Sequence, residues 1–317
     1  MNNVLLEVKD LETSLKINNE WLATVENISF ELSKGEVLGI VGESGCGKSI
    51  LSKSIIKLLP EKISKLSNGE VIFDGKRIDT LNEKQLLDIR GNDIAMIFQE
   101  PMTALNPVFT IKNQLVESIK SHKKISKKEA NNLAKDLLKK VGIARQDEIL
   151  NSYPHQLSGG MRQRVMIAMA ISCSPKLLIA DEPTTALDVT IQAQILDLLK
   201  ELQKETQMAI MMITHDLSVV AEFCDKVLVM YAGQIVEFGD IKEILHNPKH
   251  PYIQKLLSTI PKLKEEQKRL ETIEGIVPSI QAFHVNKCRF ANRCNKKLDI
   301  CNNQSPKMHV CEDVIVR

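Results

Sequence analysis

Short apolar runs alternate with segments of helical periodicity along most of the chain. The run Glu36–Val41 is bounded by glycines and is typical of a buried strand. A glycine-rich loop, Gly42–Gly47, follows it. The segment Lys48–Leu59 then places apolar residues at helical spacing, and Pro60 is expected to stop this helix. The pattern therefore predicts a strand–loop–helix unit early in the chain.

The same alternation continues to about residue 240. Short apolar runs predict further strands at 70–75, 94–98, 177–180 and 208–213, and a hairpin pairs 227–230 with 234–237. A helix is expected at 190–204, and a capping box of Ser126 and Glu129 opens another that ends near Gly142. The stretch 100–158 is expected to be mostly helical. Strands that alternate with helices predict an α/β fold with a largely parallel sheet.

Length and charge limit the classes of function. The chain has 317 residues, enough for two domains or for one large domain with an appendage. Its net charge of +2 is too balanced for a protein that works mainly by coating nucleic acid. The segment Lys262–Arg317 is mildly basic, with 11 Lys and Arg against 7 Asp and Glu.

No apolar run is long enough to span a bilayer, and charge within the first seven residues argues against a secretory signal. Any membrane attachment is therefore expected to come from other chains.

The chain has seven cysteines, and four of them fall close together near its end. Cys46, Cys173 and Cys224 are scattered and are expected to be ordinary small residues. The remaining four are Cys288, Cys294, Cys301 and Cys311. Without an export signal a disulfide framework is not expected, and clustered cysteines then favour metal ligation. Four thiolates suit either Zn²⁺ or an iron–sulfur cluster, and free or disulfide-forming thiols are the third possibility.

The loop Gly42–Ser49 fits the pattern GxxxxGK[ST] of phosphate-binding loops. Its glycines let the backbone amides turn inward toward phosphate oxygens, and the helix that follows adds positive potential. Lys48 would reach the β- and γ-phosphates, and the Ser49 hydroxyl would ligate Mg²⁺. The expected strand before the loop and helix after it argue against a chance match.

Four further residues could take part in the chemistry of the site, although each is a weaker signal when considered alone. Asp181 ends the run Leu177–Ala180, where a carboxylate can ligate Mg²⁺, and Glu182 beside it can polarise water. Taken alone, this pair also fits a strand leaving the core. His215 and Gln99 each follow an expected strand, at the edge where open α/β sheets bind ligands. A lone histidine is, however, more often structural.

A second helix start follows Leu157. Ser158 is a good N-cap, and the backbone amides of Gly159 and Gly160 after it carry no side chains that would shield them from an anion. This turn is therefore a second candidate phosphate site. A flexible loop before a well-capped helix explains the same residues equally well.

Taken together, these motifs resemble the ATP-binding subunit of an ABC transporter over about residues 4–260. Gly42–Ser49 is similar to the Walker A loop, Gln99 to the Q-loop glutamine and Leu157–Met161 to the LSGGQ signature. Leu178–Asp181 is similar to Walker B, with Glu182 as the catalytic glutamate. Ala186–Asp188 is similar to the D-loop and His215 to the switch histidine.

The resemblance implies an ATPase that uses ATP and Mg²⁺, with a RecA-like core, an antiparallel β subdomain and a helical subdomain at about 100–172. Catalysis is implied for Glu182, His215 and Gln99, and Mg²⁺ contacts for Ser49, Gln99 and Asp181. Nucleotide contacts are implied for Gly42, Glu43, Ser44, Gly45, Cys46, Gly47, Lys48, Ser49, Gln99, Asp181, Ser158, Gly159, Gly160 and Asp188. In this family two subunits sandwich two nucleotides, so the two helix starts of one chain serve different nucleotides.

The end of the chain narrows the resemblance. His250–Tyr252, Ile273–Pro278 and the four cysteines resemble the D-type ATPase of dipeptide and oligopeptide importers. That group implies an ATPase domain at 1–261, a cysteine-rich extension at 262–317, and a 4Fe–4S cluster with Zn²⁺ as the alternative. It also implies a sister ATPase, two membrane permease subunits, an extracellular peptide-binding protein, and a location at the cytoplasmic face of the membrane.

Two departures and two rival functions accompany this interpretation. The signature ends in Met161 where the general pattern has Gln, and Leu15 stands where an adenine-stacking aromatic is expected, with Trp21 nearby. Nickel or another small solute is an alternative cargo. A soluble, non-transport ABC ATPase is a second alternative, although this chain has a single ATPase half and no sustained heptads.

Overall fold

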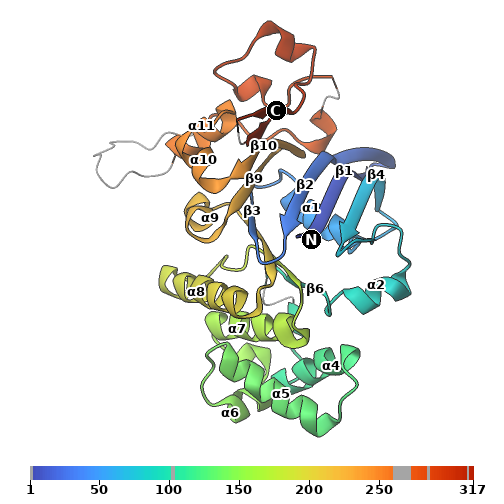
Figure 1. Ribbon diagram of the computed structural model, residues 1–317, viewed down its shortest axis with the longest axis vertical. Coiled ribbons are helices and arrows are strands. Elements are labelled where there is room, and N and C mark those ends of the chain that lie inside the picture. Colours follow the sequence, from blue (N-terminus) through green and yellow to red (C-terminus); the bar gives the residue numbers. More distant parts are fainter. Residues whose placement is uncertain (1–2, 101–103, 260–272, 284–285, 313) are drawn as a thin grey trace. The chain divides into compact units, whose positions relative to one another are not determined.

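A computed structural model of the chain describes residues 3–100, 104–259, 273–283, 286–312 and 314–317 (Figure 1). These residues form two compact units, each described by itself below. The helical unit comprises residue 3, residues 33–36 and residues 80–212. The sheet unit comprises residues 4–32, 37–79 and 213–317.

The sheet unit contains most of the strands. Its first part comprises β1 (Val4–Ile17), β2 (Glu20–Ser33), β3 (Val37–Val41), α1 (Lys48–Ile55), β4 (Ser64–Phe73) and β5 (Lys76–Arg77). Its second part comprises α9 (Leu217–Phe223), β9 (Lys226–Tyr231), β10 (Gln234–Asp240), α10 (Ile241–His246), α11 (Pro251–Ser258), the 3₁₀ turns η3 (Ile280–Ala282), η4 (Ala291–Arg293) and η5 (Asp299–Asn302), β11 (His309–Cys311) and β12 (Val314–Val316).

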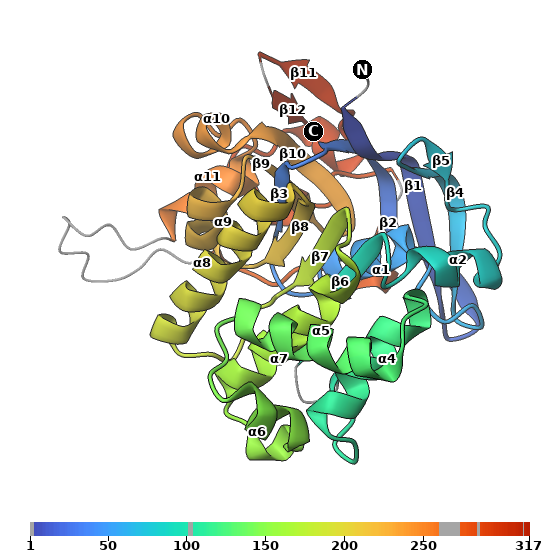
Figure 2. The same cartoon turned by 60° about the horizontal axis from the view of Figure 1, so that its bottom comes forward.

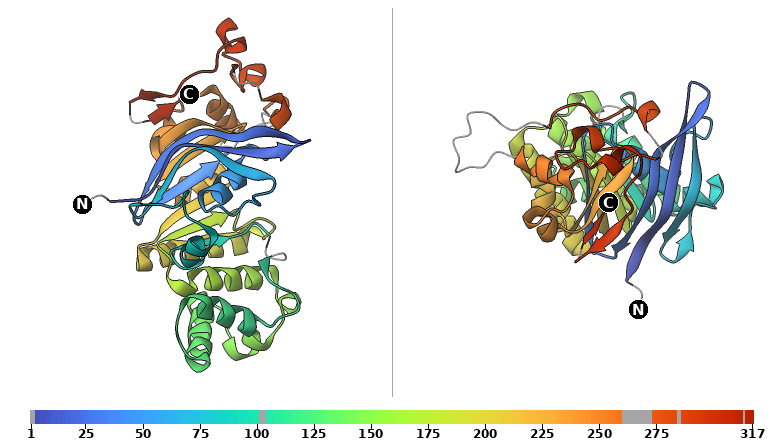
Figure 3. Two further views of the ribbon diagram at one scale, coloured as in Figure 1. Left: turned by 90° about the vertical axis from the view of Figure 1, so that its right-hand side faces the viewer. Right: turned by 90° about the horizontal axis from the view of Figure 1, so that it is seen from above.

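One sheet of this unit has the order β2-β1-β4-β5, and its long strands are clear in Figure 3. β1 and β4 are antiparallel, with Leu6 opposite Phe73. In β2 the buried Ile28, Phe30 and Leu32 alternate with exposed residues, the period of a strand with one covered face. Residues 4–33 contain no long continuous apolar run, so these strands were not predicted from the sequence.

The second sheet of this unit joins β11, β12, β10, β9 and β3 in that order. β3 lies parallel to β9, and β9 and β10 form the expected antiparallel hairpin. All five residues of β3 are buried, which is typical of a strand covered on both faces. α1 is shorter than expected and ends at Ile55, because Lys57 takes a left-handed conformation with φ +50°.

The end of the chain belongs to the sheet unit. Its described residues between 273 and 312 are largely irregular, but β12 then adds to the edge of β10, with Phe238 opposite Ile315. The expected boundary at 261/262 lies outside the described residues.

The helical unit begins with α2 (Glu83–Ile89) and β6 (Ile94–Ile97). It continues with α4 (Ile111–His122), α5 (Lys127–Lys140), α6 (Gln146–Asn151), η1 (Pro154–Gln156), α7 (Gly159–Ala170), η2 (Ile171–Cys173), β7 (Leu177–Asp181) and α8 (Val189–Thr206). β8 (Ala209–Thr214) then carries the chain into the sheet unit.

Helices α4, α5 and α7 pack on one another, and α7 also covers β6 (Figure 2). The capping box at the start of α5 is confirmed, since Ser126 and Glu129 each bond the other's backbone amide. β6 and β7 are parallel, with Ala95 opposite Leu178. Across the part of the chain that the structure describes, no helix is both long and apolar enough to cross a bilayer.

Candidate nucleotide site

The glycine-rich loop after β3 curls around a lysine ammonium. Lys48 opens α1 and is only 5% exposed. Its Nζ donates to the carbonyl oxygens of Gly42 at 2.6 Å and Glu43 at 3.2 Å. The loop therefore holds a buried positive charge at a helix start, which is the arrangement that phosphate recognition requires.

The loop needs glycine at both of its ends. A Cβ at Gly42 would lie 2.3 Å from the Met230 carbonyl oxygen, so this backbone passes against β9 with no room for a side chain. Gly47 is the N-cap of α1, with φ +105° and no side-chain cap bond. The first amides of α1 thus lack a capping side chain, and they can donate to an anion.

Cys46 lies inside the loop and is buried. Burial raises the pKa of its thiol, and this outweighs the opposite effect of the Lys48 charge. Cys46 is thus an inert packing residue, as are the buried Cys173 and Cys224.

Three residues from late in the chain support this loop, and none of them was predicted to do so. The Tyr252 hydroxyl accepts a hydrogen bond from the Glu43 amide at 3.1 Å. The Arg293 guanidinium donates to both Glu43 carboxylate oxygens, at 3.0 Å each. Arg289 donates to the Ala232 carbonyl at 2.6 Å. Arg289 and Arg293 stand between Cys288 and Cys294, but nothing in that pattern connects them with the phosphate loop.

In the helical unit the structure joins two of the expected catalytic residues. Gln99 Nε2 donates to Glu182 Oε2 at 2.9 Å, and the Thr185 hydroxyl donates to the same oxygen at 2.8 Å. Glu182 has φ +47°, directly after the fully buried strand β7. Asp181 is the last residue of that strand and is 2% exposed. A carboxylate oriented by two donors is a suitable general base.

The second helix start forms as expected. Ser158 is exposed and accepts from the Met161 amide at 3.3 Å, which caps α7. The two glycines that follow face the start of α8 and the residues before it: a Cβ at Gly160 would lie 2.8 Å from Ile191 Cγ2, and one at Gly159 would lie 3.5 Å from Leu187 Cδ2. Asp188 in turn caps α8 by accepting from the Ile191 amide at 2.9 Å. Signature and D-loop residues are therefore neighbours in this unit.

His215 is exposed, one residue past β8, and it belongs to the sheet unit together with Lys48 and Ser49. The other expected site residues, Gln99, Asp181, Glu182, Ser158–Gly160 and Asp188, belong to the helical unit.

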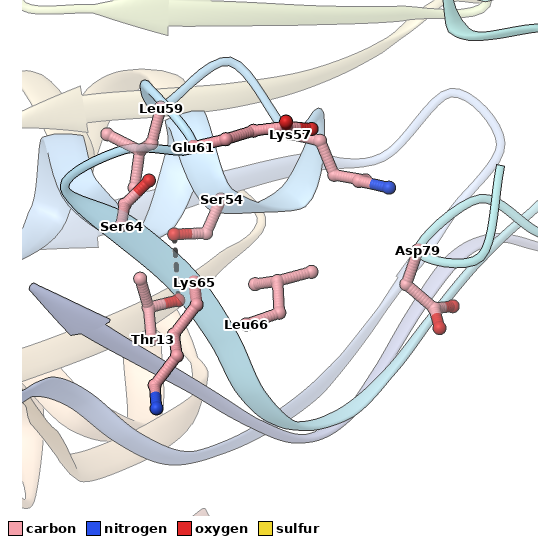
Figure 4. A pocket seen from close by; sticks show the side chains of 9 residues that line it. All are labelled: Thr13, Ser54, Lys57, Leu59, Glu61, Ser64, Lys65, Leu66 and Asp79. Carbon is pink, nitrogen blue, oxygen red and sulfur yellow. Dashed lines mark hydrogen bonds between the residues drawn. The ribbon is translucent and has the colours of Figure 1, made fainter. Parts of the chain in front are cut away.

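Leu15 and Trp21 were the candidates for adenine contact. Leu15 lies in β1 opposite Ser64, half-buried. Trp21 is 40% exposed, and the Lys65 ammonium lies 4.6 Å from its ring centroid. Lys65 also lines a cavity of about 390 Å³, in which Thr13 donates to Ser54 at 2.8 Å (Figure 4). The exposed ring makes a cation–π contact and is not part of the core.

The four clustered cysteines are brought together only in part. Cys288 donates its amide to the Cys301 carbonyl at 3.0 Å, and both line a cavity of about 220 Å³. Burial, with the nearby Cys301 and Cys294, raises the pKa of the Cys288 thiol. Cys311 is the last residue of β11. No three His, Cys, Asp or Glu side chains of the described chain are arranged to hold a metal ion, so the four-ligand set is incomplete.

Comparison with known families and proteins agrees with this geometry. The family model described as ABC transporter matches residues 25–185. A second model, described as oligopeptide/dipeptide transporter, C-terminal region, matches residues 236–301.

Two curated relatives come from Bacillus subtilis. The oligopeptide transport ATP-binding protein AppD is 48% identical over 306 residues, which is 96% of this chain and 93% of that protein. The dipeptide transport ATP-binding protein DppD is 47% identical over 309 residues, or 98% and 92% of the two chains.

Among solved structures, a dimeric ATP-binding cassette in a post-hydrolysis state with ADP and Pi is 28% identical, with a TM-score of 0.67. The match covers 75% of this chain and 99% of that one. CbiO1 from Clostridium perfringens, part of an ABC transporter complex, is 30% identical with the same TM-score, covering 78% and 92%. The mixed α/β fold is therefore the ABC ATPase cassette, and the chain belongs to the ABC transporter family, in its group of oligopeptide and dipeptide transport ATP-binding proteins.

Proposed function

We propose that this chain binds MgATP in the loop Gly42–Ser49 and that hydrolysis powers the uptake of dipeptides or oligopeptides through partner membrane permeases. The observation that carries the proposal is the buried Lys48 ammonium encircled by loop carbonyls at 2.6 and 3.2 Å. The names of the relatives, oligopeptide and dipeptide transport ATP-binding proteins, support the cargo class.

In the proposed reaction the Lys48 ammonium exchanges its carbonyl partners for oxygens of the β- and γ-phosphates, while the α1 amides donate to the same phosphates. Ser49, Asp181 and Gln99 would hold Mg²⁺, which neutralises charge that develops on the phosphates. Glu182 accepts a proton from the attacking water, in the orientation set by Gln99 and Thr185. His215 would contact the γ-phosphate.

The second helix start would serve a different nucleotide. We propose that Ser158, Gly159 and Gly160 donate to ATP held by a sister ATPase, with Asp188 at the same junction. The exposure of Ser158 and the dimeric form of the related cassette support this arrangement. The remaining partners would be two permease subunits and an extracellular peptide-binding protein, which places the chain at the cytoplasmic face of the membrane.

We further propose an ATPase domain at 1–261, with its helical subdomain at about 100–172, and an extension at 262–317 whose cysteines take up iron as a 4Fe–4S cluster, or zinc. Cys294 and Cys301 act electrostatically on the Cys288 thiol, and the Lys296 amide donates to Cys294 Sγ at 3.3 Å, but the described thiols form no three-ligand group and would have to rearrange around a metal. Cys311 would have to join them. An absorption spectrum and metal analysis of anaerobically purified protein test this: absence of both metals contradicts the proposal.

Transport in proteoliposomes tests the function as a whole. The vesicles would contain this chain, its sister ATPase and two permeases, with the binding protein and a labelled dipeptide outside. We expect ATP-dependent peptide uptake that Glu182→Gln abolishes. Uptake of nickel with no peptide uptake would favour the alternative cargo. A chain that hydrolyses ATP but never copurifies with permeases would favour the non-transport alternative.

A further inference from the structure

Residues from the cysteine-rich segment reach the phosphate loop directly. We propose that Arg293 is a positioning residue for nucleotide binding: its ion pair with Glu43 fixes the phosphate loop, so that residues 288–294 are a structural support of the ATP site. This inference rests on the proposed binding of ATP by Gly42–Ser49, and it adds a role for a segment otherwise considered only for its cysteines.

The ion pair has the geometry of a strong contact. Arg293 Nη1 and Nη2 lie 3.0 Å from the two oxygens of the Glu43 carboxylate, a two-point contact between planar groups. The Arg293 side chain is 5% exposed and that of Glu43 is 27% exposed. The guanidinium also donates to the carbonyls of Glu274 at 3.0 Å and Ile273 at 3.3 Å, so its orientation is fixed from both sides.

Glu43 transmits this restraint to the phosphate loop. Its carbonyl oxygen accepts from the Lys48 ammonium at 3.2 Å and from the Cys46 amide at 3.2 Å. Its amide donates to the Tyr252 hydroxyl. The side chain, amide and carbonyl of one loop residue are therefore all engaged, and the Arg293 pair is the contact that comes from the cysteine-rich segment.

An aromatic anchor keeps the cysteine-rich segment in place. Phe290 is 2% exposed, and its ring centroid lies 5.1 Å from that of Tyr231 and 5.4 Å from that of Tyr252. Edge-on packing of such rings stabilises a fixed arrangement beyond simple burial. Arg293 follows Phe290 within a single 3₁₀ turn, so the anchor sets where the guanidinium can reach.

Arg289 makes a second connection to the loop from the same segment. It pairs with Glu26 and donates to the Ala232 carbonyl at 2.6 Å. The next residue, Gly233, donates its amide to the Cys46 carbonyl at 2.8 Å. The phosphate loop is thus supported at both Glu43 and Cys46 from residues 288–294.

Titration of the full chain with a fluorescent MgATP analogue tests the proposal. We expect Arg293→Ala to raise Kd about tenfold or more, because loss of a charged hydrogen-bond pair leaves the Glu43 carboxylate without its partner. Arg293→Lys is expected to lose less affinity for the analogue, since an ammonium restores the charge but not the two-point contact. The matched control is Lys297→Ala, an exposed cation three positions beyond residues 288–294, which is expected to leave Kd unchanged.

Kinetics and a double-mutant cycle separate positioning from general structural damage. Arg293→Ala is expected to raise KM while kcat stays within about twofold, because the residue acts on the loop and not on the attacking water. Arg293→Ala combined with Glu43→Ala is expected to lose no more affinity than either single variant. Independent, multiplying losses would overturn the proposal, as would an unchanged Kd in a folded Arg293→Ala protein.

Two further comparisons make the result decisive. If Arg293→Ala does not unfold cooperatively, Arg293→Lys and Arg293→Gln are titrated instead. Wild-type affinity for the analogue in both variants would overturn the proposal. Failure of the wild-type chain to bind the analogue, or full binding by Lys48→Ala, would instead contradict the proposed function.

Discussion

The chain has two helix N-termini that are suited to binding phosphate, and different contacts stabilise each of them. The loop before α1 surrounds a buried lysine and is supported by Tyr252 and Arg293, which lie more than 200 positions away in the sequence. The turn before α7 is exposed at Ser158 and is held by its own cap and by packing on the start of α8. We interpret the first as a site that holds nucleotide within this chain and the second as a surface that is offered to another subunit.

The largest effect, a loss of ATP turnover, is expected from a substitution that alters neither of the two helix N-termini. Glu182→Gln removes the proposed general base while leaving Lys48 and Ser158 in place. We expect turnover to fall by a factor of about 10² to 10⁴ with nucleotide affinity retained. Steady-state ATPase assays and nucleotide titration measure the two quantities. Glu201→Gln, an exposed change on α8, is the control, and wild-type turnover in Glu182→Gln would refute the assigned base.

Removing the aromatic anchor tests the long-range support of the first site. Phe290→Ala empties a buried position between Tyr231 and Tyr252, and such changes typically cost about 3–5 kcal/mol in the free energy of unfolding. Urea unfolding of the full chain measures the loss. Leu298→Ala is the control, since that side chain is 66% exposed. Equal stability of the two variants would mean that Phe290 anchors nothing.

Acidification is expected to lower the stability of the fold through His250, whose ring packs against Phe290. His250 caps α11 through Nδ1, which accepts from the Tyr252 amide at 3.1 Å, so its neutral form fits the fold. Burial, with a smaller effect of Arg317, lowers the pKa of His250 from 6.5 to about 4. The unfolded chain therefore binds this proton first, and about 3 kcal/mol of stability is lost as the pH falls from above 6.5 to about 4.

The pH dependence is measured from urea midpoints across that range. Burial raises the pKa of the neighbouring Glu237, so the contribution of this carboxyl to stability increases as the pH falls, opposite to that of His250. His250→Gln keeps an acceptor without a titrating ring and should flatten the profile. An identical profile in the variant would show that other groups dominate.

The smallest effect is expected at the second helix start. Ser158→Ala removes one cap bond from α7, a change that typically costs about 1 kcal/mol. Thermal melting of the chain measures it. Ser121→Ala, at the exposed end of α4, serves as the control. A loss as large as that of Phe290→Ala would show that this turn is not held locally.

The elements that the sequence predicted correctly are those with a local signal. The fully buried strands β3 and β7, the hairpin of β9 and β10, and the capping box at Ser126 all follow from short windows of sequence. β1 and β2 were missed, because half-buried strands alternate with polar residues and form no continuous apolar run.

The support of the phosphate loop could not be predicted in the same way. Glu43 and Arg293 are 250 positions apart, and neither the charge pattern nor the cysteine spacing indicates that they pair. The roles of Gln99 and Glu182 came only from the family resemblance, and their hydrogen bond, together with the one from Thr185, was not predicted.

A side-by-side titration of two variants tests the central claim most directly. Lys48→Ala and Ser158→Ala would each be titrated as isolated chains with a fluorescent MgATP analogue. Loss of the lysine is expected to weaken binding about tenfold to a hundredfold, because charged hydrogen bonds to phosphate disappear. Loss of the serine is expected to leave binding unchanged, because that helix start serves the nucleotide of another subunit. Equal losses in both variants, or none in Lys48→Ala, would contradict the account.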